Sequence, residues 1–214
     1  MKKTEEKTYG IIRGGEELLK NSGSLIPKTQ VGVYPWAGIN NGRDYRPITT
    51  ALMACLPEAL YVRMETAEEN PRMQERGFSG EVYTDSCMEL FLMPDPERSA
   101  EYFNWELNAA GSMYLSLGAG RFERRDIDPE DYPSFFRVKA EIKPGSWSIE
   151  YQIPHEFIRS YFPDFAPDAG WRMRGNFFKC GEKMEFLHYG CWAWIDLPQP
   201  DFHSPAYFGS LVIL

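Results

Sequence analysis

The sequence predicts an all-β fold: a two-sheet antiparallel β-sandwich, jelly-roll-like, with one or two short helices. From Leu25 onward, apolar and polar residues alternate in short segments, as in strands that bury one face. Clusters of Gly, Pro and Asp separate these segments, as turns separate strands. A length of 214 residues suits one sandwich with a sizeable core. We therefore assign residues 1–24 to a peripheral N-terminal segment and residues 25–214 to the sandwich.

About ten strands are expected, and two turns fix how four of them pair. Leu56, Pro57 and Glu58 join two strands into a hairpin, and the turn sequence Lys143–Ser146 joins two more. The clearest strands are residues 48–55, 59–65, 86–93, 102–108, 113–117, 135–142, 147–153, 171–179 and 207–214.

Helical signals are confined to two short segments. Residues 16–20 have the composition of a short helix inside a Lys- and Glu-rich stretch. Pro154 ends a strand and suits the first position of a second helix over residues 155–162. Residues 120–133 form the longest expected loop.

Alternation also assigns side chains to faces of the sheets. Phe103, Trp105 and Leu107 share one face of their strand, and Trp147, Ile149, Tyr151 and Ile153 share one face of theirs, so both sets are assigned to the core. The opposite faces carry carboxylates and amides at every second residue. These polar side chains are Glu89, Asn104, Glu106, Asn108, Glu150 and Gln152, which form either a hydrogen-bonding floor or an ordinary solvent-facing surface.

Charge and hydropathy exclude several classes of partner. The net charge of −8 and a pI near 5.0 disfavour nucleic acid and anionic lipid as partners. No run of 18 apolar residues spans a membrane, and the N-terminus shows no signal peptide. The chain as given is therefore expected in the cytoplasm with reduced cysteines, or outside the cell if a leader was removed.

The sequence offers candidate residues for three kinds of reactive site. Two of Glu89, Glu106 and Glu150 could act as paired carboxylates on a glycosidic bond. Cys180, His188, Cys191 and His203 are zinc-ligand types, but their spacing matches no paired CxxC pattern. Residues 126–131 offer oxygen ligands for calcium without the EF-hand spacing, and a solvated acidic loop is favoured there.

Several segments, in order, resemble family 9 carbohydrate-binding modules. They are the strand 85–92, the strand 102–108 with Gly111, the strand 147–154, the segment 174–176 and the C-terminal 208–211. The resemblance spans about residues 30–214. It implies a stand-alone β-sandwich that binds sugars, that is related to modules attached to glycoside hydrolases, and that holds structural calcium. In such modules two tryptophans enclose a terminal sugar ring.

The resemblance implies a non-catalytic module that binds a mono- or oligosaccharide, in connection with breakdown of xylan- or cellulose-type polysaccharides. The C-terminal stacking ring falls at Trp192 or Trp194, and Phe78 and Tyr83 stand where the upstream partner is expected. The polar ligand-binding candidates are Glu89, Asn104, Asn108, Arg174 and Asn176. A glycoside-acting enzyme with paired glutamates and a protein-interaction module remain as alternatives.

Overall fold

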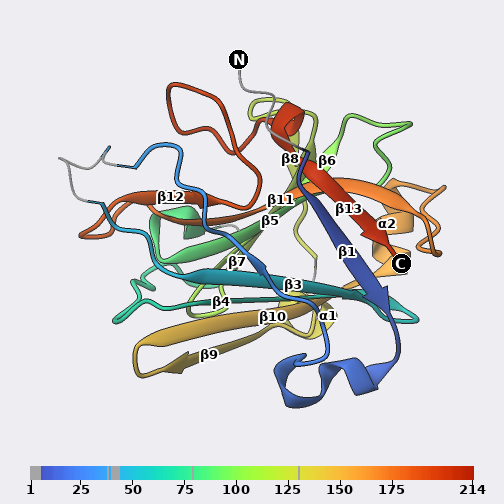
Figure 1. Cartoon of the computed structure of the whole chain (residues 1–214), viewed down its shortest axis with the longest axis horizontal. Coiled ribbons are helices and arrows are strands. Elements are labelled where there is room, and N and C mark those ends of the chain that lie inside the picture. The colour runs from blue at the N-terminus through green and yellow to red at the C-terminus, as the bar shows by residue number, and fades with distance from the viewer. Residues whose placement is uncertain (1–5, 38, 40–43, 79, 130) are drawn as a thin grey trace.

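The computed structural model describes residues 6–37, 39, 44–78, 80–129 and 131–214, and it shows two β-sheets packed face to face (Figure 1). Sheet A has the order β8 (Arg124–Asp126), β7 (Met113–Gly118), β6 (Tyr102–Asn108), β5 (Cys87–Met93), β11 (Arg172–Gly181) and β13 (Gly209–Ile213), with β12 (His188–Cys191) also on β11. Sheet B has the order β3 (Thr49–Cys55), β4 (Ala59–Thr66), β10 (Ser146–Pro154) and β9 (Lys139–Lys143), with β2 (Thr29–Gln30) also on β3.

These pairings confirm the predicted β-sandwich and both predicted hairpins. Strands β3 and β4 pair antiparallel across Leu56–Glu58, and β9 and β10 pair antiparallel across the turn before Ser146. The exception to the antiparallel pattern is β1 (Thr8–Arg13), which pairs parallel with β13 through residues 8–11 and parallel with β3 through residues 12–13. Strand β1 thus connects the two sheets at one corner (Figure 1).

The prediction that residues 1–24 are peripheral does not hold for β1. Tyr9 and Ile11 are buried in the main core, and the Tyr9 hydroxyl accepts a hydrogen bond from the Met53 amide at 2.9 Å. Tyr9 and Ile11 alternate only across Gly10 and are followed by the apolar Ile12, so the local pattern is too short to reveal a strand. The short helix expected over residues 16–20 is present as the 3₁₀ helix η1 (Glu16–Ser22).

Within the described residues, two α-helices and two more 3₁₀ turns complete the fold. Helix α2 (His155–Tyr161) follows Pro154 as predicted, and α1 (Tyr132–Phe135) occupies the start of what was expected to be a strand. The 3₁₀ turns are η2 (Val82–Thr84) and η3 (Pro205–Tyr207). No helix in the described ranges is long and apolar enough to cross a membrane.

The main core lies between the sheets and contains the side chains that alternation assigned to it. Phe103, Trp105 and Leu107 from sheet A and Trp147 and Ile149 from sheet B are each at most 1% exposed. This cluster joins both sheets over their whole overlap, so burial of apolar surface there is the main stabilising contribution to the fold.

The outer face of sheet A is also covered, which alternation did not predict. Every residue of β5 is buried, including the outward-facing Phe91. Phe91 and Phe178 belong to a second apolar cluster with Trp36, Phe202 and Phe208, which come from outside the main strands. The loop that follows β12 therefore folds back over the outer face of sheet A and leaves one depression there.

Candidate functional site

The depression on the outer face of sheet A is a cleft of about 450 Å³, within the size range of small-molecule sites. Its floor is made by adjacent strands that contribute Glu89 (β5), Glu106 (β6), Tyr114 (β7) and Cys180 (β11). The walls are made by segments far apart in the sequence. They contribute Gly80, Glu81, Tyr83, Arg121, Arg124, Glu182, Tyr189, Pro200, Phe202 and His203.

Glu89 and Glu106 lie side by side on this floor because strand register pairs them directly across β5 and β6. They are 2% and 3% exposed. Glu106 accepts a hydrogen bond from the Asn104 side-chain amide at 2.8 Å through Oε1, whereas its Oε2 is buried and has no hydrogen-bond partner among the described residues. Glu106 therefore offers an acceptor that is already positioned and is not used within the described part of the chain.

Burial dominates the acid–base behaviour of this pair. Removal from water raises the pKa of Glu106 to about 7, although the Asn104 hydrogen bond and the Arg124 charge oppose that rise. Burial, Cys180 and the neighbouring Glu106 raise the pKa of Glu89 well above its usual value. Two carboxyls buried in this way favour their protonated forms unless a ligand supplies a hydrogen bond or a positive charge.

Aromatic rings form much of the wall. Tyr189 and Phe202 meet edge to face with centroids 5.9 Å apart, and Trp36 supports both from behind. Tyr83 lies on the short turn η2 and is half-buried in the cleft wall. Flat rings beside fixed acceptors are the combination that suits a sugar, whose C–H face is apolar and whose hydroxyls are polar.

One end of the cleft is closed by cations and a neutral histidine. The His203 ring is hydrogen-bonded to the Arg124 guanidinium and, through Nδ1, to the Tyr102 hydroxyl at 2.9 Å. Burial and the two guanidinium groups of Arg124 and Arg121 lower the pKa of His203, so this ring stays neutral. Arg121 pairs with Asp201 at 2.8 Å, which ties the β8 segment to the loop that carries Phe202.

Of the nine predicted ligand-binding residues, Tyr83 and Glu89 line the cleft. Asn104 supports the cleft from its floor, because its amide holds Glu106 while its carbonyl accepts from the Ser116 hydroxyl. The sequence also predicts Glu106 as part of this polar floor. It does not predict that Tyr114, Tyr189, Phe202, His203, Arg121 and Arg124 line the cleft, because their placement depends on loop positions that no local pattern encodes.

Three predicted polar residues hold backbone instead of facing the cleft. The Asn108 carbonyl accepts from the amides of Ala110 and Ser112, which fixes the turn after β6. Arg174 donates to the carbonyls of Ala206 and Phe208. Asn176 is fully buried and bonds both the amide and the carbonyl of Ala193.

The remaining aromatic candidates lie outside the cleft. Trp192 is 0% exposed, and its indole N–H donates to Thr29 Oγ1 at 2.9 Å, so neither face of its ring is open to a ligand. Trp194 is 44% exposed but is not among the residues that line the cleft. Phe78 packs against Tyr132, with centroids 5.2 Å apart, away from the floor residues.

Glu150 and Gln152 lie on β10 and therefore on sheet B, so they do not join Glu89 and Glu106. Glu150 forms ion pairs with Arg63 at 3.1 Å and Lys139 at 3.0 Å. These cations, together with the Tyr61 hydroxyl, outweigh partial burial and lower the pKa of Glu150. Glu150 thus belongs to a surface charge network on the opposite side of the molecule.

The predicted zinc ligands do not come together, and the predicted calcium segment is described only in part. In the described ranges, one group of three or more His, Cys, Asp or Glu residues brings its ligand atoms close together, and it consists of Cys87, Glu89 and Cys180. The candidate zinc ligands Cys180, His188, Cys191 and His203 therefore do not form a site. His188 instead accepts a hydrogen bond from the buried Lys179 at 2.9 Å. Glu130 of the acidic segment 126–131 lies outside the described residues, and structural calcium stays a prediction.

The comparisons with known proteins agree with this fold. The model for carbohydrate-binding family 9 matches residues 17–213. The chain belongs to carbohydrate-binding family 9. The match includes almost the whole sandwich and all of the residues named above that line the cleft.

Several solved structures share this fold. A proposed carbohydrate-binding protein from Bacteroides uniformis superposes with a TM-score of 0.81 at 25% identity, covering 98% of this chain and 100% of that chain. A family 9 carbohydrate-binding module from Caldicellulosiruptor kristjanssonii in complex with glucose gives a TM-score of 0.67 at 12% identity, with 97% and 96% coverage. A family 9 module from the same organism in complex with cellotriose gives a TM-score of 0.66 at 13% identity, covering 97% of this chain and 93% of that chain. No curated protein matches the chain.

Proposed function

We propose that this family 9 chain binds a mono- or oligosaccharide in the cleft on the outer face of sheet A. The observation that carries the proposal is the buried and unpartnered Oε2 of Glu106 at the floor of a cleft walled by aromatic rings. A sugar hydroxyl would satisfy that oxygen, which otherwise bears the cost of burial without a hydrogen bond. Tyr83 and Tyr189 would contact the C–H face of the same ring.

Binding is favoured over hydrolysis by the placement of the two floor carboxyls. Glu89 and Glu106 are cross-strand neighbours on one floor, so both lie on the same side of anything bound above them. Hydrolysis by two carboxyls needs them to flank the scissile bond, about 5–9.5 Å apart. Glu150, the third carboxylate considered, lies on the other sheet.

Calorimetric titration of the full chain with glucose and with cellotriose tests this proposal. We expect saturable binding that Tyr83→Ala weakens and that Trp194→Ala leaves unchanged, because Tyr83 lines the cleft and Trp194 does not. Both are partly exposed aromatic residues, so the pair is a matched comparison. Binding that is lost in Trp194→Ala and kept in Tyr83→Ala would place the sugar elsewhere.

We further propose that the ligand is a fragment of a β-1,4-linked plant polysaccharide. The support is the family membership and the cellotriose complex of a structural relative. Titrations with cellotriose, xylotriose and the α-linked maltotriose separate the possibilities. Tighter binding of either β-linked trisaccharide than of maltotriose supports the assignment, and the reverse order contradicts it.

A further inference from the structure

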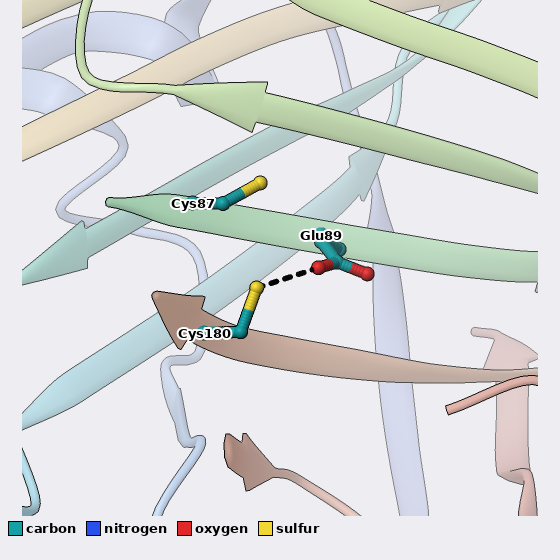
Figure 2. Close-up of side chains that lie close together, drawn as sticks. All are labelled: Cys87, Glu89 and Cys180. Atoms are coloured by element: carbon teal, nitrogen blue, oxygen red, sulfur yellow. Dashed lines mark hydrogen bonds between the residues drawn. The ribbon is translucent and has the colours of Figure 1, made fainter. Parts of the chain in front are cut away.

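One end of the cleft floor carries two thiols and a carboxylate in direct proximity. Cys87 and Cys180 are paired directly across β5 and β11, and Glu89 lies two residues beyond Cys87 on the same face. Their ligand atoms all lie within 4.8 Å of one another. Figure 2 shows the sulfur of Cys180 directed at the carboxylate of Glu89, with Cys87 on the same strand as Glu89.

This group is enclosed, and within the described part of the chain no ion pair involves it. Cys87, Cys180 and Glu89 are 0%, 2% and 2% exposed, and none of the ion pairs found there involves Glu89. The Cys180 thiol donates to Glu89 Oε1 at 2.9 Å. A buried carboxylate without a cation is costly, so Glu89 must either hold a proton or gain a positive partner.

We propose that Cys87, Cys180 and Glu89 form a binding site for a soft divalent metal ion, with Zn²⁺ as the best match. Zn²⁺ combines thiolate and carboxylate ligands, whereas Ca²⁺ and Mg²⁺ select oxygen ligands alone. With metal–ligand bonds of about 2.0–2.3 Å, tetrahedral ligand atoms lie roughly 3.5–3.8 Å apart. The 4.8 Å limit exceeds these separations by about 1–1.3 Å, whereas Cys180 Sγ and Glu89 Oε1, now 2.9 Å apart, would move apart by roughly 0.6 Å. Small side-chain rotations supply shifts of this size.

The three ligands must lose their protons to bind the ion, and their negative charges then balance its positive charge. Each thiol releases its proton to solvent as its sulfur bonds the ion, and Glu89 binds as carboxylate, so three negative ligands face a double positive charge. Burial raises the pKa of Cys87 to about 12, so without metal the thiols keep their protons. Glu106, the cross-strand neighbour of Glu89, adds a further negative charge when it is ionised, and that charge favours a cation.

The metal site would open toward the cleft. Cys180 and Glu89 line the cleft, whereas Cys87 lies deeper against the sheet. A fourth ligand would therefore come from the cleft side, where water has access. This inference goes beyond sugar binding and does not depend on it, because the three ligands are present whether or not the cleft takes a sugar.

Equilibrium dialysis of the full, reduced chain against Zn²⁺ alone tests the site. We expect one Zn²⁺ per chain, with affinity at least tenfold lower in Cys87→Ser and in Cys180→Ser. Cys55→Ser is the matched control, because Cys55 is similarly buried but lies on sheet B. Failure to bind Zn²⁺, or an equal loss in Cys55→Ser, would overturn the proposal.

Substitution with Co²⁺ gives a readout that needs no variant. Thiolate ligation produces an intense sulfur-to-cobalt charge-transfer band in the near ultraviolet, together with visible bands of tetrahedral cobalt. We expect both in the wild-type chain at one equivalent of Co²⁺. Visible bands typical of octahedral oxygen ligation, without the charge-transfer band, would contradict ligation by Cys87 and Cys180 even if the serine variants failed to fold.

Discussion

Glu106→Gln is the most informative single substitution in the proposed sugar site. Glutamine has the same size, and its side-chain oxygen can still accept the hydrogen bond from Asn104 that holds Glu106 in place. The change replaces the unpartnered Oε2 with a neutral amide nitrogen. It therefore alters the atom offered to the ligand while leaving the surrounding contacts intact.

The size of the effect follows from the kind of hydrogen bond that is lost. A hydrogen bond to an ionised acceptor contributes about 1.5–3 kcal/mol and one between neutral groups about 0.5–1.5 kcal/mol. The difference of about 1–1.5 kcal/mol corresponds to roughly five- to thirteenfold weaker sugar binding. Titration calorimetry at pH 8 measures it, because burial raises the pKa of Glu106 to about 7 and the wild-type carboxyl is then mostly ionised.

Glu150→Gln is the matched control, since it makes the same chemical change on the opposite sheet. We expect its sugar affinity to equal that of the wild-type chain. An affinity of Glu106→Gln within twofold of wild type, in a variant with an unchanged melting temperature, would refute the role given to Oε2.

Three further predictions concern stability. Asn176→Ala removes three buried hydrogen bonds to the backbone of Trp192 and Ala193, so we expect urea denaturation to show a free energy of unfolding lower by about 3 kcal/mol. A decrease below about 1 kcal/mol would contradict this. Gly209→Ala places a Cβ 2.5 Å from Trp192 Cζ3, so we expect the free energy of unfolding to fall by about 1–3 kcal/mol in the same assay. An unchanged free energy of unfolding would contradict this close contact between Gly209 and Trp192. Burial, with help from the Arg159 charge, lowers the pKa of His155 to about 4, so this ring takes up a proton in the unfolded chain before it does so in the folded one. The free energy of unfolding should therefore fall as the pH falls from about 6.5 to 4. His155→Gln should reduce the slope of that free energy against pH by up to about 1.4 kcal/mol per pH unit. An unchanged slope would show that His155 is not held neutral.

Local pattern was sufficient for strands whose partners are near in sequence. The hairpin formed by β3 and β4 follows from alternation and a proline turn, and Phe103 and Trp105 lie in the core as alternation requires. Strand β1 was missed because its partners β13 and β3 are distant in the chain, and parallel pairing leaves no mark on its own residues.

The site was predictable only in part for the same reason. Period-two spacing brought Glu89, Asn104 and Glu106 onto one floor, as the sequence suggested. Alternation could not show that loops cover that floor, so Asn176 was interpreted as a ligand contact although it holds the backbone of Ala193. Tyr189 reaches the cleft through tertiary contacts with no local signature.

A crystal structure of the full chain with cellotriose tests the central claim most directly. We expect a sugar ring in the cleft on the outer face of sheet A, with one hydroxyl bonded to Glu106 Oε2 and the ring against Tyr83 or Tyr189. Cellotriose bound at Trp194 with an empty cleft would contradict it.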